Sequence, residues 1–490
     1  MTYYLPSVGE TSRRTLLVAC LLSLAGCAPL PAVDDPVQPK NIDQLSSPNS
    51  FAGPAAIWPK TDWWKAYGDA QLGSLIEEAL RDSPNLAVAE ARLRQAGAMT
   101  QVAGAPLMPE VTGNASFTQE KQSYNYLTPR SIAPKNWNDY GRATLNLSWE
   151  LDFWGKNRSA LAAALSEQQA MQAEVAQTRL ILSTSVASAY AELLHLFTVR
   201  DSAEAALVIR ATTVILFQKR HSFGLENLAS VRQVESRQAS AEAELRAIDE
   251  RIALQRNGIA ALLGTGPDRG LAITRPAVLF SGATGLPPNL ELELLGRRPD
   301  IVAARLRTEA AARRIDQRKA GFYPSVNLLA FTGFHSLGID NLTRSGSDIG
   351  SFGPAISLPI FNTERLQGEL HGARADYDIA VSTYNAALTN ALREVADAVT
   401  SRKSLDGELA ASRAAVTAAD EAHRIVSKRY EGELATYLDV LNAEDALISA
   451  QRSLADIETR ALVLDVALIR ALGGGFGSHD NQGSKSGAPA

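Results

Sequence analysis

The chain has 490 residues, of which 46% are hydrophobic, 21% charged and 6% aromatic, and its formal net charge is −5. This composition is typical of a folded protein and excludes long disorder, a collagen-like repeat and a disulfide-rich miniprotein. The mild acidity argues against a nucleic-acid binder, and the only two cysteines, Cys20 and Cys27, provide neither a disulfide framework nor a metal cage.

The N-terminus has the pattern of a signal peptide covering residues 1–26. Arg13 and Arg14 precede a short apolar run, and small residues follow it. The run is much shorter than the ~20 residues of a membrane-spanning helix. Leu24 to Cys27 resembles the bacterial lipobox, in which the cysteine is acylated, and Ala28 after it favours sorting to the outer membrane. An ordinary secretory peptide and a twin-arginine signal remain open as alternatives. Residues 27–59 lack periodicity and are predicted to form an extended, lipidated leash.

The rest of the chain is an internal duplication. Ser83 to Ala89 corresponds to Arg298 to Ala304, at a spacing of 215 residues, and Ser185 to Ala189 corresponds to Glu394 to Ala398, at a spacing of 209. The change in spacing predicts a longer loop in the first copy, between its two strands. We therefore expect a first structural repeat over 60–270, an equatorial connection over 271–289, a second repeat over 290–473 and a disordered tail over 474–490.

Each repeat contains the same predicted elements. A first helix is followed by two strands with alternating apolar and polar residues, at about 110–150 in the first copy and, less clearly, 325–361 in the second. Long helices follow at about 157–264 and 363–472. Residues 157–223 contain neither Gly nor Pro and would span about 100 Å as a helix, which no compact globular core accommodates.

The second long helix of each repeat carries apolar residues at heptad spacing. In the first copy this seam runs from Val234 to Leu262, and in the second from Ala443 to Ala471 without a polar interruption. Such spacing predicts supercoiled packing, although a helix in a soluble bundle gives a similar pattern. Alanine on other faces predicts close neighbours on two sides and therefore a wall of helices.

Four strands per chain are too few to close a barrel, which needs about eight. Open strand edges in a bilayer leave unpaired backbone groups that cost several kcal/mol each. If the apolar faces meet lipid, several chains must therefore pool their strands. A soluble sheet of two hairpins is the alternative, and the lipobox together with the long helices favours the membrane.

The sequence resembles the TolC/OprM-type outer-membrane efflux family, in its lipoprotein branch, over about residues 58–473. The motifs that carry the resemblance occur in family order: Trp149 to Lys156, Tyr323 to Ser325, Leu358 to Phe361, Arg393 to Ala398 and Tyr437 to Leu441. The resemblance implies a mainly α protein with membrane β structure. Its expected form is a homotrimer with a twelve-stranded outer-membrane β-barrel, four strands per chain, continued by a long periplasmic α-helical barrel.

The function implied by the resemblance is passive conduction of small amphipathic compounds or drugs out of the cell. The expected partners are a periplasmic adaptor, an inner-membrane pump of the resistance-nodulation-division type, and outer-membrane lipid, with no nucleic acid. An exit duct for type I protein secretion and, less in keeping with the strands, a lipid-anchored coiled-coil scaffold are the alternatives.

The resemblance also assigns residues at the helix ends. Adaptor docking is expected at the two turns, which contain Gly224, Leu225, Gly432, Glu433 and Leu434. Glu433 stands where the family often has Gly. The periplasmic gate is expected at Leu438, Asp439 and Asn442, where Asn442 replaces a frequent Asp and removes one charge. An alternative role for Asp439 is simply to cap or solvate the helix.

The sequence does not predict an enzyme. The six histidines show no metal-ligand spacing, and the glycine-rich segment 264–270 lacks the Gly-Lys-Ser/Thr ending of a phosphate loop. We expect no catalytic residues, cofactor or metal.

Overall fold

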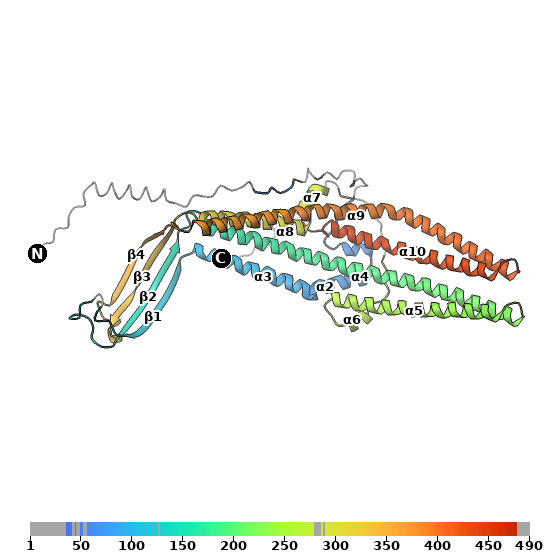
Figure 1. Cartoon of the computed structure of the whole chain (residues 1–490), viewed down its shortest axis with the longest axis horizontal. Coiled ribbons are helices and arrows are strands. Elements are labelled where there is room, and N and C mark those ends of the chain that lie inside the picture. Colours follow the sequence, from blue (N-terminus) through green and yellow to red (C-terminus); the bar gives the residue numbers. More distant parts are fainter. Residues whose placement is uncertain are drawn as a thin grey trace. The chain divides into compact units, whose positions relative to one another are not determined.

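The computed structural model describes residues 36–41, 45, 50–51, 56–125, 128–278, 286–287 and 290–477. The signal peptide, Cys27 and residues 478–490 of the predicted tail lie outside them. The elements in chain order are η2 (Trp63–Tyr67), α2 (Ala70–Asp82), α3 (Pro84–Gly104), η3 (Ala105–Leu107), β1 (Glu110–Glu120), β2 (Asn138–Glu150), α4 (Lys156–Ser222), α5 (Leu228–Leu262), α6 (Asp268–Leu271), α7 (Leu290–Arg297), α8 (Pro299–Ala320), β3 (Ser325–Leu337), η4 (Ile339–Asn341), β4 (Asp348–Ser357), α9 (Thr363–Glu431) and α10 (Tyr437–Ala471) (Figure 1).

The chain forms two compact units. Among the described residues, one unit contains 36–39, 94–170 and 304–383, and the other contains 40–93, 171–303 and 384–477. Long helices and four antiparallel strands confirm the predicted fold class.

The first unit contains a single sheet of order β1-β2-β3-β4. All neighbours are antiparallel, and the β2–β3 pairing, for example Leu145 with Thr332, joins the two copies. All four strands meet the helices at the same end of the sheet, because α3 leads into β1, β2 into α4, α8 into β3 and β4 into α9. β1 is exposed along its whole length.

The second unit has its main core around α2 and α4. Tyr190 and Leu193 of α4 are fully buried with Leu75 and Ile76 of α2. Asp69 caps α2 by accepting the N–H groups of Gln71 and Leu72, and its carboxylate also accepts the Tyr190 hydroxyl at 2.8 Å. The cap therefore fixes the start of α2 against the long helix.

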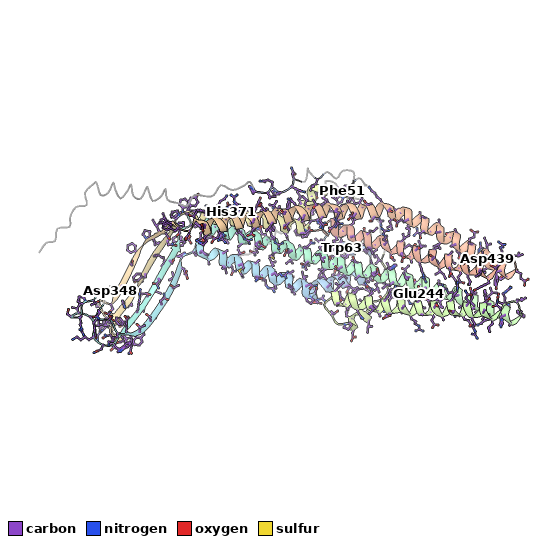
Figure 2. The ribbon with its side chains drawn as sticks, in the orientation of Figure 1. Phe51, Trp63, Glu244, Asp348, His371 and Asp439 are labelled. Atoms are coloured by element: carbon purple, nitrogen blue, oxygen red, sulfur yellow. The ribbon has the colours of Figure 1, made fainter. Side chains whose placement is uncertain are left out.

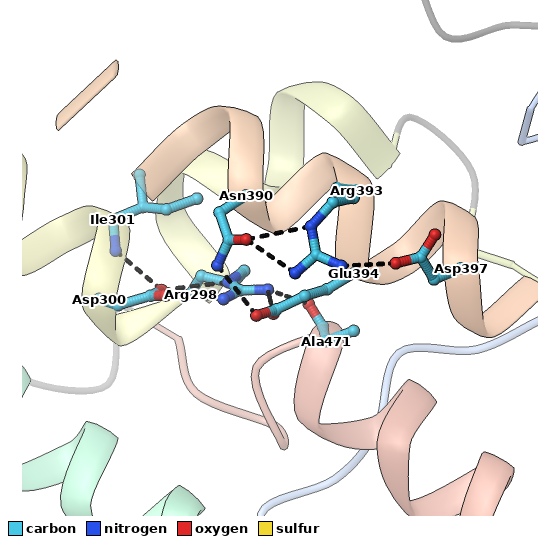
Figure 3. A network of polar contacts seen from close by, with 8 residues as sticks. All are labelled: Arg298, Asp300, Ile301, Asn390, Arg393, Glu394, Asp397 and Ala471. Carbon is cyan, nitrogen blue, oxygen red and sulfur yellow. Dashed lines mark hydrogen bonds and ion pairs between the residues drawn. The ribbon is translucent and has the colours of Figure 1, made fainter. Parts of the chain in front are cut away.

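A buried network of charged side chains lies in the same unit, at the start of α8 (Figure 3). The Arg298 guanidinium, 6% exposed, pairs with Asp300 at 2.6 Å and with Glu394 of α9 at 2.8 Å. It also donates to the carbonyl of Ala471 at the end of α10. One side chain thus connects three helices that lie far apart in the sequence.

The duplication is visible in how the helices end. Gly264 and Gly473 follow α5 and α10 with left-handed φ of 76° and 85°. A Cβ atom at Gly264 would lie 2.8 Å from the carbonyl oxygen of Asp82, and one at Gly473 would lie 2.0 Å from that of Arg297. Both copies therefore need glycine at this place because backbone from the start of the repeat approaches it closely.

The heptad seam behaves differently in the two copies. In α5, seam residues such as Val234, Ala241 and Ile248 are buried. In α10 most of the predicted seam is half-buried, and the buried row lies one or two positions later, including Glu444 and Thr459. The reason is a second neighbour: Thr459 lies 2.9 Å from His195 of α4, so α10 is covered on two sides.

Candidate functional site

The two turns at the ends of the long helices have the same hydrogen-bond pattern. After α4, the N–H of Leu225 donates to the carbonyl of Arg220 at 2.9 Å, and after α9 the N–H of Leu434 donates to Arg429 at 2.7 Å. Each bond ends its helix at a residue in the left-handed backbone conformation, which is Gly224 in the first turn and Glu433 in the second. The five residues expected to dock an adaptor all lie in these turns.

Both turns expose apolar side chains. Leu225 is 54% exposed and Leu434 is 70% exposed. Phe223 and Leu228 beside the first turn are also exposed.

The predicted gate residues lie in the first two turns of α10. Leu438, Asp439 and Asn442 are all exposed, and their spacing places them on one side of the helix. Figure 2 labels Asp439 next to the turn between α9 and α10.

Asp439 is also the third residue of α10 and forms a capping box with the N-cap residue Thr436. Its carboxylate accepts the Thr436 N–H at 2.8 Å and the Thr436 hydroxyl at 2.7 Å, and its own N–H faces the Thr436 side chain. The hydrogen bond from the Thr436 side chain, with that from its backbone, lowers the pKa of Asp439 below its ordinary value. The capping role that the sequence left open is therefore present, and the carboxylate stays ionised and exposed.

Two tyrosines join the helical hairpin of α9 and α10 to the helical hairpin of α4 and α5. The Tyr430 hydroxyl donates to the Glu226 carboxylate at 2.7 Å, and the Tyr437 hydroxyl donates to Gln233. Phe217, fully buried, stacks on Tyr430 with ring centres 5.5 Å apart and meets Tyr437 edge-on at 5.3 Å. The turns are consequently held by one aromatic cluster, so that movement of one hairpin must disturb the other.

The surroundings of Glu226 favour the ionised form of its carboxyl group. Burial opposes its ionisation, but hydrogen bonds, first of all that from Tyr430, outweigh this and lower the pKa of Glu226. Burial and the bond to Glu226 in turn raise the pKa of Tyr430. The Arg220 guanidinium lies 4.6 Å above the Tyr430 ring and adds a cation–π contact.

Further along α10, Glu444 is only 1% exposed. It accepts the Thr213 hydroxyl at 2.9 Å and lies 3.5 Å from Arg210, both on α4. Burial raises the pKa of Glu444, against the hydrogen bond from Thr213 and the charge of Arg210. The burial of Glu444 was not expected from the sequence, because nothing in the local pattern separates it from its exposed neighbour Asp445.

Within the described ranges, no group of three or more His, Cys, Asp or Glu side chains is placed to hold a metal ion. The two helix turns therefore offer an exposed apolar surface, an exposed carboxylate and a network of hydrogen bonds between the helix pairs.

Comparison with known proteins identifies relatives along most of the chain. The family described as outer membrane efflux protein matches residues 75–265 and 292–474. Two separate matches confirm the internal duplication inferred from the sequence.

Individual relatives cover most of the chain. The fusaric acid resistance protein FusA of Burkholderia cepacia is 36% identical over 379 residues, which are 74% of this chain and 70% of FusA. The multidrug resistance outer membrane protein MdtP of Escherichia coli K12 is 30% identical, covering 94% of this chain and 97% of MdtP. The crystal structure of the outer membrane protein VceC of Vibrio cholerae matches with a TM-score of 0.82 and 47% identity, covering 86% of this chain and all of VceC.

Proposed function

Because the chain belongs to the outer membrane efflux protein family, we propose that it is the outer-membrane channel of a tripartite pump that exports small amphipathic compounds. It works as a homotrimer, its strands cross the outer membrane and its helices extend into the periplasm. Conduction is passive, and the energy comes from an inner-membrane pump of the resistance-nodulation-division type, joined to the channel by a periplasmic adaptor. The protein is a channel and not an enzyme.

One observation carries this proposal: the sheet has two open edges. Within the described residues, β1 and β4 each pair on one side only, and β1 is exposed throughout. In lipid, unpaired edge groups would cost several kcal/mol each. Pairing β1 of one copy with β4 of the next removes both edges, and three copies give a closed barrel of twelve strands.

The helix tips supply the remaining functions of the channel. Leu225 and Leu434 form the docking surface for the adaptor. Leu438, Asp439 and Asn442 line the narrow end of the tunnel, where three copies of Asp439 make one ring of negative charge. Asn442 adds no second ring, so the entrance favours cations through a single ring.

Cys27 is the lipid attachment site in this proposal. The segment that follows it is long enough for the cysteine to reach the membrane. The N–H of Val37 donates to Asp378 of α9 at 3.1 Å. Asp378 lies 15 residues beyond the start of α9 at Thr363, about 22 Å along the helix. The ten residues from Cys27 to Val37 reach about 36 Å when extended, which is sufficient to return to the membrane.

The test combines assembly and transport. Native mass spectrometry of the purified full-length protein should give a trimer. Deleting the gene should raise susceptibility to exported compounds only in cells that also express the adaptor and the pump. Substituting Leu225 and Leu434 by Asp should abolish efflux while the trimer persists, and Leu254→Asp, at a similarly exposed position on α5, serves as control. A stable monomer, or unchanged efflux after deletion, would refute the proposal.

A further inference from the structure

A cavity of about 420 Å³ lies in the first unit, where the strands meet the helices. Its walls come from the end of β2 and the turn into α4, from the end of α8, and from the segment between β4 and α9. The channel function proposed above does not use this cavity.

One wall of the cavity carries excess positive charge. The Glu369 carboxylate accepts from Arg318 at 3.0 Å and from Arg365 at 2.6 Å. Each guanidinium has five N–H donors, so a single shared carboxylate leaves most of them available. Arg318 and Arg365 are about half exposed, and together with Glu369 they carry one net positive charge.

The other wall carries carboxylates. Glu150 pairs with Lys156 at 3.0 Å. Asp152, whose side chain is 9% exposed, accepts the N–H groups of Asn157 and Arg158. The Arg158 guanidinium also pairs with Asp152 at 3.3 Å, so this wall is neutral and the two walls together carry one net positive charge. Both oxygens of Glu150 accept from Lys156, but an ionised carboxylate has about four acceptor sites. A ligand with a phosphate group for the arginines and an ammonium group for Glu150 therefore fits the two walls.

An apolar cavity adjoins the charged one. It has a volume of about 330 Å³, shares residues 150–153 with the first cavity and is completed by Leu107, Trp149 and Arg158. Beside it Phe153 is 64% exposed and Trp154 is 52% exposed. The Trp154 ring stacks on Tyr323 with centres 4.7 Å apart. Exposed aromatic rings of this kind are typical of a membrane–water interface.

We propose that the two cavities together bind one zwitterionic phospholipid with a phosphoethanolamine headgroup. Arg318 and Arg365 hold the phosphate, Glu150 accepts from the ammonium group, and an acyl chain lies in the apolar cavity. The inference rests on the proposed function in one respect, since it requires that the sheet cross the outer membrane. The strand ends nearest the helices are then at the periplasmic boundary, where phospholipid headgroups lie.

The proposal is tested on the delipidated full-length trimer by native mass spectrometry. The probes are dihexanoyl-phosphatidylethanolamine, dihexanoyl-phosphatidylglycerol and soluble O-phosphoethanolamine. The ethanolamine lipid should bind at least about tenfold more tightly than the other two. The double variant Arg318→Gln with Arg365→Gln should lose at least about tenfold in that affinity, because charge-assisted hydrogen bonds to the phosphate disappear.

Arg305→Gln is the matched control. Arg305 lies on α8 in the same unit, is half exposed and pairs with Glu309 four residues later at 2.6 Å, as Arg365 pairs with Glu369. It does not line the cavity and should bind the lipid like the wild type.

Several outcomes would overturn the proposal. Unchanged binding by the double variant would remove the site, equal binding of phosphatidylglycerol would remove the zwitterionic preference, and equal binding of O-phosphoethanolamine would point to a soluble ligand. If the double variant does not assemble, a photoreactive phosphatidylethanolamine is applied to the wild type, with adducts expected on residues 149–158 and adducts only elsewhere counting against the site. Efflux is measured in parallel: absent lipid binding with normal efflux refutes the lipid site alone.

Discussion

Glu433 adopts the left-handed backbone conformation of Gly224, its counterpart 209 residues earlier, with φ of 61° against 72°. A residue with a Cβ atom adopts this conformation at a cost of about 1–2 kcal/mol. The second helix tip therefore stores strain that the first one does not.

Replacing Glu433 by Gly should relieve this strain. We expect the turn to be stabilised by about 1 kcal/mol, so amide hydrogen exchange around residues 430–436 should slow about fivefold. Glu433→Ala keeps the Cβ atom and serves as control, without a comparable gain. Equal exchange in Glu433→Gly and Glu433→Ala would contradict the strain argument.

The bond between Tyr430 and Glu226 should restrain opening at the tips. Tyr430→Phe removes the hydroxyl and leaves a partly buried carboxylate without its strongest donor, at a cost of about 1–3 kcal/mol. We expect higher single-channel conductance in planar bilayers. Glu226→Gln, which still accepts the hydroxyl, should have a smaller effect. If both variants conduct like the wild type, the bond does not restrain the tip.

Asp439 should act through its charge, separately from its capping role. Asp439→Asn retains a capping oxygen but removes the proposed charged ring, so cation selectivity in bilayers should fall. Thr436→Ala retains the charge and loses the cap, so the start of α10 should be destabilised by about 1 kcal/mol with selectivity kept. Because the folded-state pKa of Asp439 is lowered, its stabilising contribution is present above the unfolded value of 3.8 and disappears as the pH falls through the folded value.

Glu444 should give the opposite pH dependence. Its folded-state pKa is raised by burial, so the folded protein binds this proton more tightly than the unfolded chain. Its contribution to stability therefore decreases as the pH rises from the unfolded value of 4.5 through the folded value. Hydrogen exchange in the first turns of α10 should show this dependence in the wild type, and Glu444→Gln should remove it. An unchanged pH profile in Glu444→Gln would assign the effect to another group.

Arg298 should be essential for the packing of α8, α9 and α10. Arg298→Met leaves Asp300, Glu394 and the Ala471 carbonyl without this donor, and we expect a loss of about 3–5 kcal/mol. Arg393→Met is the control from the same region, since the pair of Arg393 with Asp397 is exposed and such pairs contribute about 0.3–0.5 kcal/mol. Similar urea denaturation midpoints for the two variants would disprove the distinction.

The elements that sequence analysis predicted well are those with local signals. Alternating residues identify β1 and β2, the absence of Gly and Pro identifies α4, and the two internal spacings identify the repeats. The equivalence of Gly264 and Gly473 is also visible in the sequence, because both follow a leucine at the end of an apolar pattern. These signals come from neighbouring residues or from matching the two copies along the chain, so no tertiary information is needed.

The row of α10 that becomes buried was not predictable in the same way. A heptad pattern indicates one face, but α10 packs on α4 as well, and this second contact buries Glu444 and Thr459. For the same reason the pairing of Tyr430 with Glu226 could not be inferred, since 204 residues separate the two side chains.

The sequence by itself determined the order of helices and strands and the positions of both tips, because hydrophobic period and turn residues act over a few positions. It also determined the duplication, because matching residues recur at fixed spacings along the chain. Only the tertiary structure decided which carboxylates are buried, which are paired and which charged side chains line the cavity where the strands meet the helices. Those properties depend on the low dielectric and the donors that distant segments bring to each group, which no local pattern specifies.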